Sequence, residues 1–314
     1  MKKKTSIGGQ ALIEGIMMKG PEKVSMAVRK ADGTIFIETN ALSLKDQNKI
    51  KKIPFIRGTI ILFEQLIMGT KMLMRSADIA MEDLSEEEKE AQKDWVDKLF
   101  EKKFFKDFGI TDLAIYVSLV ISLFFGLFLF LYLPTQSVKL FEQFSNNVLI
   151  KNLIEGIVRL IIFFIYLILI SQMKDIKRVF EYHGAEHKTI YAYENGLELT
   201  VENVRKFSTL HPRCGTSFLL IVIIISIIVF SFAGWQGVLM RVLLRLLLLP
   251  VVVGISYEII KWSGRSESKI AKLISIPGML LQKITTKEPD DLQIEVAIAA
   301  IKEVITEDSE LDRW

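Results

Sequence analysis

Long apolar runs recur beyond residue 112 and predict membrane-spanning helices. The runs are Leu113–Leu133, Leu153–Met173, Phe218–Ala233 and Val238–Ile260. A helical run of about 20 apolar residues matches the thickness of a bilayer's hydrocarbon core. The first run carries no charge and ends at Pro134, and the second carries only Glu155 and Arg159, near one end. We therefore predict a mainly α-helical polytopic membrane protein with about four transmembrane helices.

An earlier apolar stretch, residues 54–74, has a different pattern. It is long enough to span a bilayer, but it carries Arg57, Glu64, Gln65 and Lys71. Charged side chains are costly in a lipid-facing helix. The stretch is therefore predicted to be an interfacial or protein-buried helix.

The N-terminal segment has short β-favouring runs instead of long apolar ones. Val24–Lys30 and Thr34–Thr39 flank Asp32-Gly33, which is a strong hairpin signal. The preceding leader, residues 5–21, is punctuated by glycine and proline. We expect there either a bent segment that brings backbone close to another element or simply a turn-rich leader, and a small β-containing element after it.

The C-terminal segment predicts a break and then an amphipathic helix. Ser275-Ile276-Pro277-Gly278 is expected to interrupt the chain. Glu288-Pro289-Asp290-Asp291 then opens a helix that runs to about Ile305. Its apolar residues fall on one face, which is expected to pack on a cytoplasmic domain.

These patterns divide the chain into seven segments. They are a cytoplasmic Gly-rich leader and β-hairpin (1–53), an interfacial or buried helix (54–74), a charged cytoplasmic helix or linker (75–112), transmembrane helices 1 and 2 (113–173), a cytoplasmic His/Cys loop between spans 2 and 3 (174–217), transmembrane helices 3 and 4 (218–260) and a cytoplasmic C-terminal region with the amphipathic helix (261–314).

The distribution of charge orients the predicted bundle. Lys and Arg concentrate before the first span, in residues 174–217 and after the last span. The positive-inside rule then places both termini and the His/Cys loop in the cytoplasm, for a multi-pass protein of the inner (cytoplasmic) membrane. Arg241 and Arg245 oppose this orientation, and we expect them to snorkel or to bind a lipid headgroup.

The overall composition limits the partners. The net charge of +3 is too small to indicate nucleic acid, whereas a mean hydropathy of +0.34 indicates the lipid bilayer. A single cysteine excludes a disulfide within the chain. Four spans would form a small bundle, which is compatible with a homo-oligomer, although no motif indicates one.

Candidate chemistry is concentrated between Tyr182 and Ser217, which contain all three histidines and the only cysteine of the chain. His183 and His187 stand four residues apart, so on a helix both point in the same direction and can bind one divalent ion. Glu186 lies beside them. His-x-x-Glu-His is the inverted form of the zincin motif, in which the glutamate handles the proton of a water molecule. Gly184 leaves a bare patch of helix for a substrate or another backbone.

His211 and Cys214 form a second pair of metal-binding side chains. Together with His183 and His187 they would complete a tetrahedral site for a divalent metal ion, with zinc favoured. Four protein ligands would make the site structural, and three with an open position would make it catalytic; both remain open. Arg213 would lower the pKa of Cys214 or hold an anion. Alternatively, the histidines cap helices or bind headgroups, and Cys214 is a small buried residue.

Two further acids are weaker candidates. Glu258 lies at the inner end of the last span, where an acidic residue marks a site or pairs with Lys261 or Arg265. Glu14, in the leader, is weaker still.

Four stretches resemble the YqhQ-like family of bacterial multi-pass membrane proteins. They are residues 8–21 (Gly-Gly-Gln-Ala-Leu-Ile-Glu-Gly-Ile-Met-Met-Lys-Gly-Pro), 182–188 (Tyr-His-Gly-Ala-Glu-His-Lys), 211–218 (His-Pro-Arg-Cys-Gly-Thr-Ser-Phe) and 281–300, which includes Lys-Glu-Pro-Asp-Asp-Leu-Gln. The resemblance covers nearly the whole chain. It implies a membrane protein described as a predicted metal-dependent enzyme, and it supplies neither substrate nor catalytic residue.

The leading functional hypothesis is a metal-dependent hydrolytic enzyme. Its ligands would be His183, His187 and His211, with Cys214 as fourth ligand or nearby thiol, and its catalytic base Glu186. The substrate would be membrane-embedded, either a peptide or a lipid-linked molecule. The alternative is a non-enzymatic scaffold with a structural metal site or a headgroup- or partner-binding loop. A transporter is disfavoured because the spans lack paired broken helices.

Overall fold

The N-terminal residues form a four-stranded antiparallel sheet. The computed structural model describes residues 4–42, 53–82, 120–140, 147–232, 234, 237–266, 268–306, 308 and 311–312. The strands are β1 (Gly8–Leu12), β2 (Gly15–Lys19), β3 (Lys23–Arg29) and β4 (Ile35–Ala41), in the spatial order β1-β2-β3-β4. The predicted hairpin is confirmed as β3–β4, with Gly33 at φ 86° in its turn. The leader, expected to be a bent segment, instead pairs as the hairpin β1–β2.

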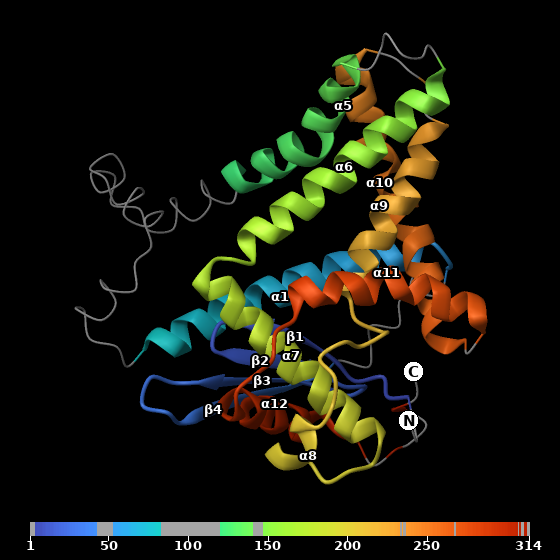
Figure 1. Ribbon diagram of the computed structural model, residues 1–314. Helices are drawn as coiled ribbons and strands as arrows, with labels where there is room; N and C mark the ends of the chain where they lie inside the picture. Colours follow the sequence, from blue (N-terminus) through green and yellow to red (C-terminus); the bar gives the residue numbers. More distant parts are fainter. Residues whose placement is uncertain are drawn as a thin grey trace, which may run out of the picture.

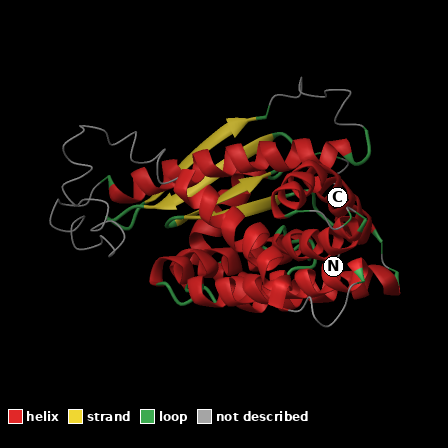
Figure 2. Cartoon of the chain, turned by 90° about the horizontal axis from the view of Figure 1, so that it is seen from above, coloured by secondary structure: helices red, strands yellow, loops and turns green. Residues whose placement is uncertain are grey.

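Alternation along the strands gives the sheet two apolar faces. Ile16 and Met18 of β2 belong to a core shared with helices α7 (Lys174–Glu194), α8 (Val201–Arg205) and α12 (Asp291–Val304). Met17, between them, belongs to a second core with the end of α1 (Ile56–Met81). Because successive side chains of a strand point to opposite faces, one sheet supports both layers. Figure 2 shows these strands within an otherwise helical chain.

The C-terminal helix forms as the sequence predicts. Asp290 caps α12 and forms a capping box with Gln293. Its buried residues Ile294, Ala297 and Ile301 pack in the core with α7 and the sheet. The prediction of an amphipathic helix to about Ile305 is confirmed.

Above the sheet, apolar helices form a bundle (Figure 1). Three of them are long and apolar enough to cross a membrane: Val120–Leu140, Val148–Ile170 (α6) and Leu239–Arg265, within α10 (Val238–Arg265). The third predicted span, Phe218–Ala233, corresponds to α9 (Thr216–Ser231), an apolar helix of 16 residues. At 1.5 Å per residue α9 is about 24 Å long, shorter than a bilayer core. The described residues thus support a membrane protein with three candidate spans, and a further span at α9 stays a prediction.

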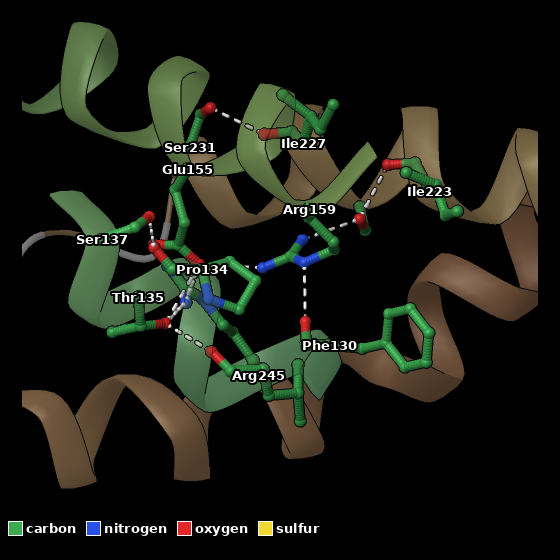
Figure 3. A network of polar contacts seen from close by, with 12 residues as sticks. Phe130, Pro134, Thr135, Ser137, Glu155, Arg159, Ile223, Ile227, Ser231 and Arg245 are labelled. Atoms are coloured by element: carbon green, nitrogen blue, oxygen red, sulfur yellow. Dashed lines mark hydrogen bonds and ion pairs between the residues drawn. The ribbon is translucent and has the colours of Figure 1, made fainter. Parts of the chain in front are cut away.

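The sequence predicts that the first span ends at Pro134, but this prediction is wrong. Its helix continues through a π-helical turn (η3, Phe128–Tyr132), α5 (Leu133–Ser137) and a last turn to Leu140. Proline lacks an N–H, so it leaves the carbonyl four residues earlier without its helical donor. That carbonyl, on Phe130, accepts a hydrogen bond from Arg159 Nε at 2.9 Å (Figure 3). The predicted part before residue 120 lies outside the described residues.

Charged side chains inside the bundle pair with one another (Figure 3). Glu155 on α6 is 1% exposed and accepts hydrogen bonds from Arg159 at 2.8 Å and from Arg245 Nη2 at 2.5 Å. Thr135 donates to the same carboxylate at 3.1 Å, and Arg159 reaches Ser226 of α9 at 3.1 Å. The expectation that Arg245 snorkels is therefore wrong, because Arg245 is 3% exposed and is bound to Glu155. The network ties four helices together.

Helices α1 and α11 (Lys269–Thr285) lie between the bundle and the sheet (Figure 1). α1 includes the predicted interfacial or buried stretch and is not among the three candidate spans found in the described residues. α11 runs through Pro277 and Gly278, so the predicted break is wrong. A Cβ on Gly278 would lie 2.1 Å from Ser217 Oγ, which shows that the glycine permits close packing of α11 on the start of α9. The charged segment of residues 83–112 lies outside the described residues.

Both described ends of the chain lie on the sheet's side of α1 and α11 (Figure 1). Ser6 N–H donates to the Asp312 carbonyl at 3.1 Å, and the Thr5 hydroxyl bonds the Asp312 carboxylate. The two ends and α7 therefore share one side of the bundle.

Replacement of Glu155 by Gln tests the network inside the bundle. The substitution leaves two buried guanidinium groups without their carboxylate, so we expect the free energy of unfolding to fall by about 3–5 kcal/mol. Denaturant unfolding in detergent micelles, followed by circular dichroism, measures it. Glu202→Gln, at a solvent-exposed site on α8, is the matched control and should change the value by no more than about 0.5 kcal/mol. Equal stabilities of the two variants would contradict a structural role of the network.

Candidate metal centre

Helix α7 and the turn before α9 bring the predicted ligands together. His183 and His187 lie one turn apart on α7, with ring centroids 4.4 Å apart. Cys214 lies in the turn just before α9, where Thr216 N–H points to its Sγ at 3.4 Å. Amide N–H groups at a helix start favour a thiolate. The i, i+4 prediction on a helix is confirmed.

Three donor atoms converge at this point. One ligand atom each of His183, His187 and Cys214 lies within 4.8 Å of the others. His183 Nε2 is 3.1 Å from Cys214 Sγ. Two imidazoles and a thiolate are a donor set that suits a borderline-soft divalent ion. This group could hold a metal.

Backbone carbonyls orient both imidazoles. His183 Nδ1 contacts the Thr285 carbonyl at the end of α11, at 2.8 Å, and His187 Nδ1 contacts the Thr209 carbonyl. A carbonyl only accepts, so each Nδ1 carries the proton. Metal-binding histidines usually donate their second N–H in this way. The Nε2 of His187, which is 1% exposed, has no hydrogen-bond partner among the described residues. A buried atom of this kind needs a partner, and a metal ion would provide it.

The group is strongly coupled electrostatically. Burial alone would raise the pKa of the Cys214 thiol, but the imidazoles of His183 and His187 lower it well below its ordinary value. Burial alone would lower the pKa of His183, but the Cys214 thiolate raises it to about 9. In the absence of metal, the side chains of Cys214 and His183 therefore form a thiolate–imidazolium pair.

The N-terminal leader holds Glu186. Gly9 N–H of β1 donates to Glu186 Oε1 at 2.9 Å. A Cβ on Gly9 would lie 2.9 Å from the Glu186 carboxyl carbon, which explains the glycine. The prediction that the leader brings backbone close to another element is confirmed at this contact. Burial raises the pKa of Glu186 above its ordinary value.

His211 lies beside the three donors with a different partner. Its ring centroid is 5.6 Å from that of His187, and its Nε2 faces Glu194 Oε2 at 3.5 Å. Burial lowers the pKa of His211. Glu194, 0% exposed, also binds Arg213. Of the two roles predicted for Arg213, it therefore holds an anion, the Glu194 carboxylate. The pKa of Cys214 is lowered by the imidazoles of His183 and His187.

No sequence motif identifies several groups that support the site. Gln282 of α11 clamps the backbone of His211, accepting from its N–H at 2.7 Å and donating to its carbonyl at 2.8 Å. The carbonyls of Thr285 and Thr209 act through the backbone, which no side-chain motif identifies. A buried glutamine in an apolar helix face was the one available indication, since such a group must be paired.

Two acidic candidates have partners of other kinds. Glu258 pairs with Arg57, rather than with Lys261 or Arg265. Glu14 joins β1–β2 to α7 through Arg178 and the Tyr182 hydroxyl.

The bare patch at Gly184 admits another backbone, one of the two predicted occupants. A Cβ there would lie 2.0 Å from the Lys287 carbonyl oxygen, and Lys287 N–H donates to the Phe180 carbonyl at 2.9 Å. This contact holds the segment that carries Thr285 against α7.

Gly184→Ala tests this contact. Alanine normally stabilises a helix interior by about 0.5–1 kcal/mol relative to glycine. Here the new methyl group would displace residues 285–287, so we expect a loss of about 1–3 kcal/mol in chemical unfolding experiments. Gly215→Ala is the control, because a Cβ there meets nothing within 4 Å and its φ is −61°. A neutral or stabilising Gly184→Ala would show that the segment does not pack as described.

Comparisons with known proteins agree with the resemblance of the motifs. A family model described as "Protein of unknown function (DUF1385)" matches residues 53–307. A protein of Bacillus subtilis (strain 168), named "Uncharacterized protein YqhQ", is 38% identical over 304 residues, covering 95% of this chain and 92% of that protein. No solved structure matches the chain. The chain therefore belongs to the DUF1385 family, which includes YqhQ-like proteins of unknown function.

Proposed function

We propose that the protein is a membrane-anchored, metal-dependent hydrolase whose divalent ion is held by His183, His187 and Cys214. One observation carries the proposal. Both imidazoles donate Nδ1–H to backbone carbonyls, which places their Nε2 atoms beside the Cys214 sulfur. A metal ion would bind there by displacing the second proton of the His183 imidazolium. Zinc is the favoured ion because it binds imidazole and thiolate together.

The ligand set supports a catalytic site over a structural one. His211, the fourth predicted ligand, is not part of the group of three donors, and its Nε2 lies 3.5 Å from Glu194 Oε2. That leaves three protein ligands, and zinc sites with three protein ligands and an open position are the catalytic type. If metal binding turned His211 away from Glu194, the site would close and become structural.

Residues of this chain supply the remaining functions of a hydrolytic site. The Gly9 N–H holds Oε1 of Glu186, so Oε2 is the atom that would take a proton from a nucleophilic water molecule. The raised pKa of Glu186 suits such a group near neutral pH. A bound zinc ion would supply Lewis acidity and lower the pKa of that water.

The position of the site supports a substrate at the membrane surface. α7 follows the candidate span α6 after three residues, and Cys214 directly precedes the apolar α9. We propose that this side, with both termini, faces the cytoplasm at the inner membrane, as the positive-inside rule indicates. A membrane-embedded peptide or lipid-linked molecule would reach the site there.

Cobalt substitution tests the ligand set without a known substrate. In the detergent-purified protein, Co²⁺ bound by Cys214 should give a sulfur-to-cobalt charge-transfer band. His187→Ala removes a ligand and should weaken binding by more than the 10–100-fold typical of losing an orienting partner. His211→Ala is the matched control and should keep the metal and the band. Added azide should change the cobalt spectrum if a coordination position is open.

Two results would contradict the enzymatic proposal. Loss of metal in His211→Ala equal to that in His187→Ala would indicate four protein ligands. A cobalt absorption spectrum that does not change when azide is added would indicate a site without an open coordination position. Either result would favour the alternative of a scaffold with a structural metal.

A second candidate function follows from the 3.1 Å contact between His183 Nε2 and Cys214 Sγ. A thiolate beside an imidazolium is the arrangement of a nucleophilic cysteine. Iodoacetamide distinguishes the two functions, because the chain has a single cysteine. The metal-site proposal expects Cys214 to resist alkylation when purified and to react after chelation. Rapid alkylation of the untreated, metal-loaded protein would favour the nucleophile instead.

A further inference from the structure

An open cavity lies at the C-terminal end of α10. Its volume is about 360 Å³, and its lining residues come from the first turn of α1 and the last turns of α10. They are Arg57, Glu258, Lys261, Trp262, Arg265 and Ser266. None of them belongs to the His/Cys group.

The lining carries excess positive charge. It contains three cations and one carboxylate, a difference of two positive charges. The carboxylate, Glu258, is committed to Arg57 through two hydrogen bonds, of 2.7 Å and 2.5 Å, in the fork geometry. Within the described parts of the chain, no carboxylate lies within ion-pair distance of Lys261 or Arg265. An anion in the cavity would therefore meet two cations that have no ion-pair partner among the described residues.

The cations are held close together. The Arg57 guanidinium lies 6.0 Å from the centre of the Tyr257 ring, and the Lys261 ammonium lies 5.8 Å from the same centre. The pairing with Glu258 uses Arg57 Nε and Nη2 and leaves Nη1 as a donor. Arg57 is thus fixed in orientation, which reduces the entropy lost on binding an anion.

The position of the cavity matches the level of lipid headgroups. α10 is a candidate membrane span that ends at Arg265. Trp262 is exposed, as tryptophans are at membrane interfaces. α11, which follows, exposes Ile270 and Leu273 near its start. Apolar groups on both sides of a cationic cavity are the surroundings of a phosphate at a bilayer surface.

We propose that this cavity binds a phosphate group, supplied either by an anionic lipid headgroup or by free phosphate. Lys261, Arg265 and Nη1 of Arg57 would hold the phosphate oxygens, and Trp262 would pack beside the acyl or glycerol portion of a lipid. The inference is independent of the metal proposal, since the two sites share no residue.

Quenching of Trp262 fluorescence tests the proposal. The three other tryptophans, Trp95, Trp235 and Trp314, are replaced by Phe, and the full chain is reconstituted in phosphatidylcholine vesicles. Brominated phosphatidylglycerol or brominated phosphatidylcholine is then added to the lipid mixture. We expect the anionic lipid to quench Trp262 more strongly at equal mole fraction.

Charge variants locate the effect. Lys261→Gln/Arg265→Gln should weaken the apparent affinity for brominated phosphatidylglycerol about 25-fold, since each of these two cations, in contact with the phosphate, contributes about a factor of five. Lys269→Gln/Lys272→Gln removes the same charge from exposed positions of α11 and should keep the lipid preference. Inorganic phosphate distinguishes the two sources: if it relieves the quenching, the cavity accepts free phosphate, and if it does not, the site requires a lipid.

Two outcomes would overturn the proposal. Equal quenching of the chain by both brominated lipids would show that the cavity does not select the anionic headgroup, and this result needs no charge variant to fold. Equal losses in the two double variants would show general attraction to a charged surface rather than a built site.

Discussion

The burial of α7 is the constraint on which the arrangement of the rest depends. This helix is covered by the sheet, by α12 and by the segment after α11, yet it carries Glu186, Lys188 and Glu194 in buried positions. A buried charged group must be paired. Each finds its partner far away in sequence: Gly9 for Glu186, Glu288 for Lys188, and Arg213 with Thr5 for Glu194. The pairing of these three buried side chains thus brings the N-terminal segment, the segment after α11 and the turn before α9 into contact with α7. The buried Nε2 atoms of His187 and His211 both lack a hydrogen bond in the described chain, but only that of His211 has a carboxylate within ion-pair distance among the described residues. The Nε2 of His187 is therefore the stronger indication of a missing ligand.

The same requirement operates inside the bundle. Glu155 pairs with both Arg159 and Arg245, and Pro134 frees a carbonyl that accepts a hydrogen bond from Arg159. The apolar helices and the metal donors are also continuous along the chain, because α6 leads into α7 and Cys214 leads into α9. A change in the packing of α9 against α11 would therefore be transmitted to Cys214 and to Gln282, which clamps His211. The site is built at the junction of the two layers rather than in either one.

Much of this could be predicted from the sequence because it depends on periodicity. Apolar runs, the Asp32-Gly33 turn and the four-residue spacing of His183 and His187 are local patterns, and each was found. The predictions are wrong where contacts between residues distant in sequence override local patterns. Proline usually ends a helix, but two prolines lie within helices here. The carbonyl freed by Pro134 accepts a hydrogen bond from Arg159. α11 continues through Pro277 and packs on the start of α9. The carbonyls that orient the histidines belong to the backbone, so no side-chain pattern in the sequence can predict them. The sequence pattern does not predict the contact of His211 with Glu194, because a histidine three residues before a cysteine is typical of a metal ligand.

We infer that two imidazoles and one thiolate hold a single metal ion. Zinc X-ray absorption spectroscopy on the detergent-purified chain, with metal content measured on the same sample, tests this ligand set. We expect about one zinc ion per chain, with one sulfur neighbour at about 2.3 Å and imidazole nitrogens at about 2.0–2.1 Å. A chain that binds no metal after reconstitution, or binds it without a sulfur neighbour, would contradict the proposed metal site.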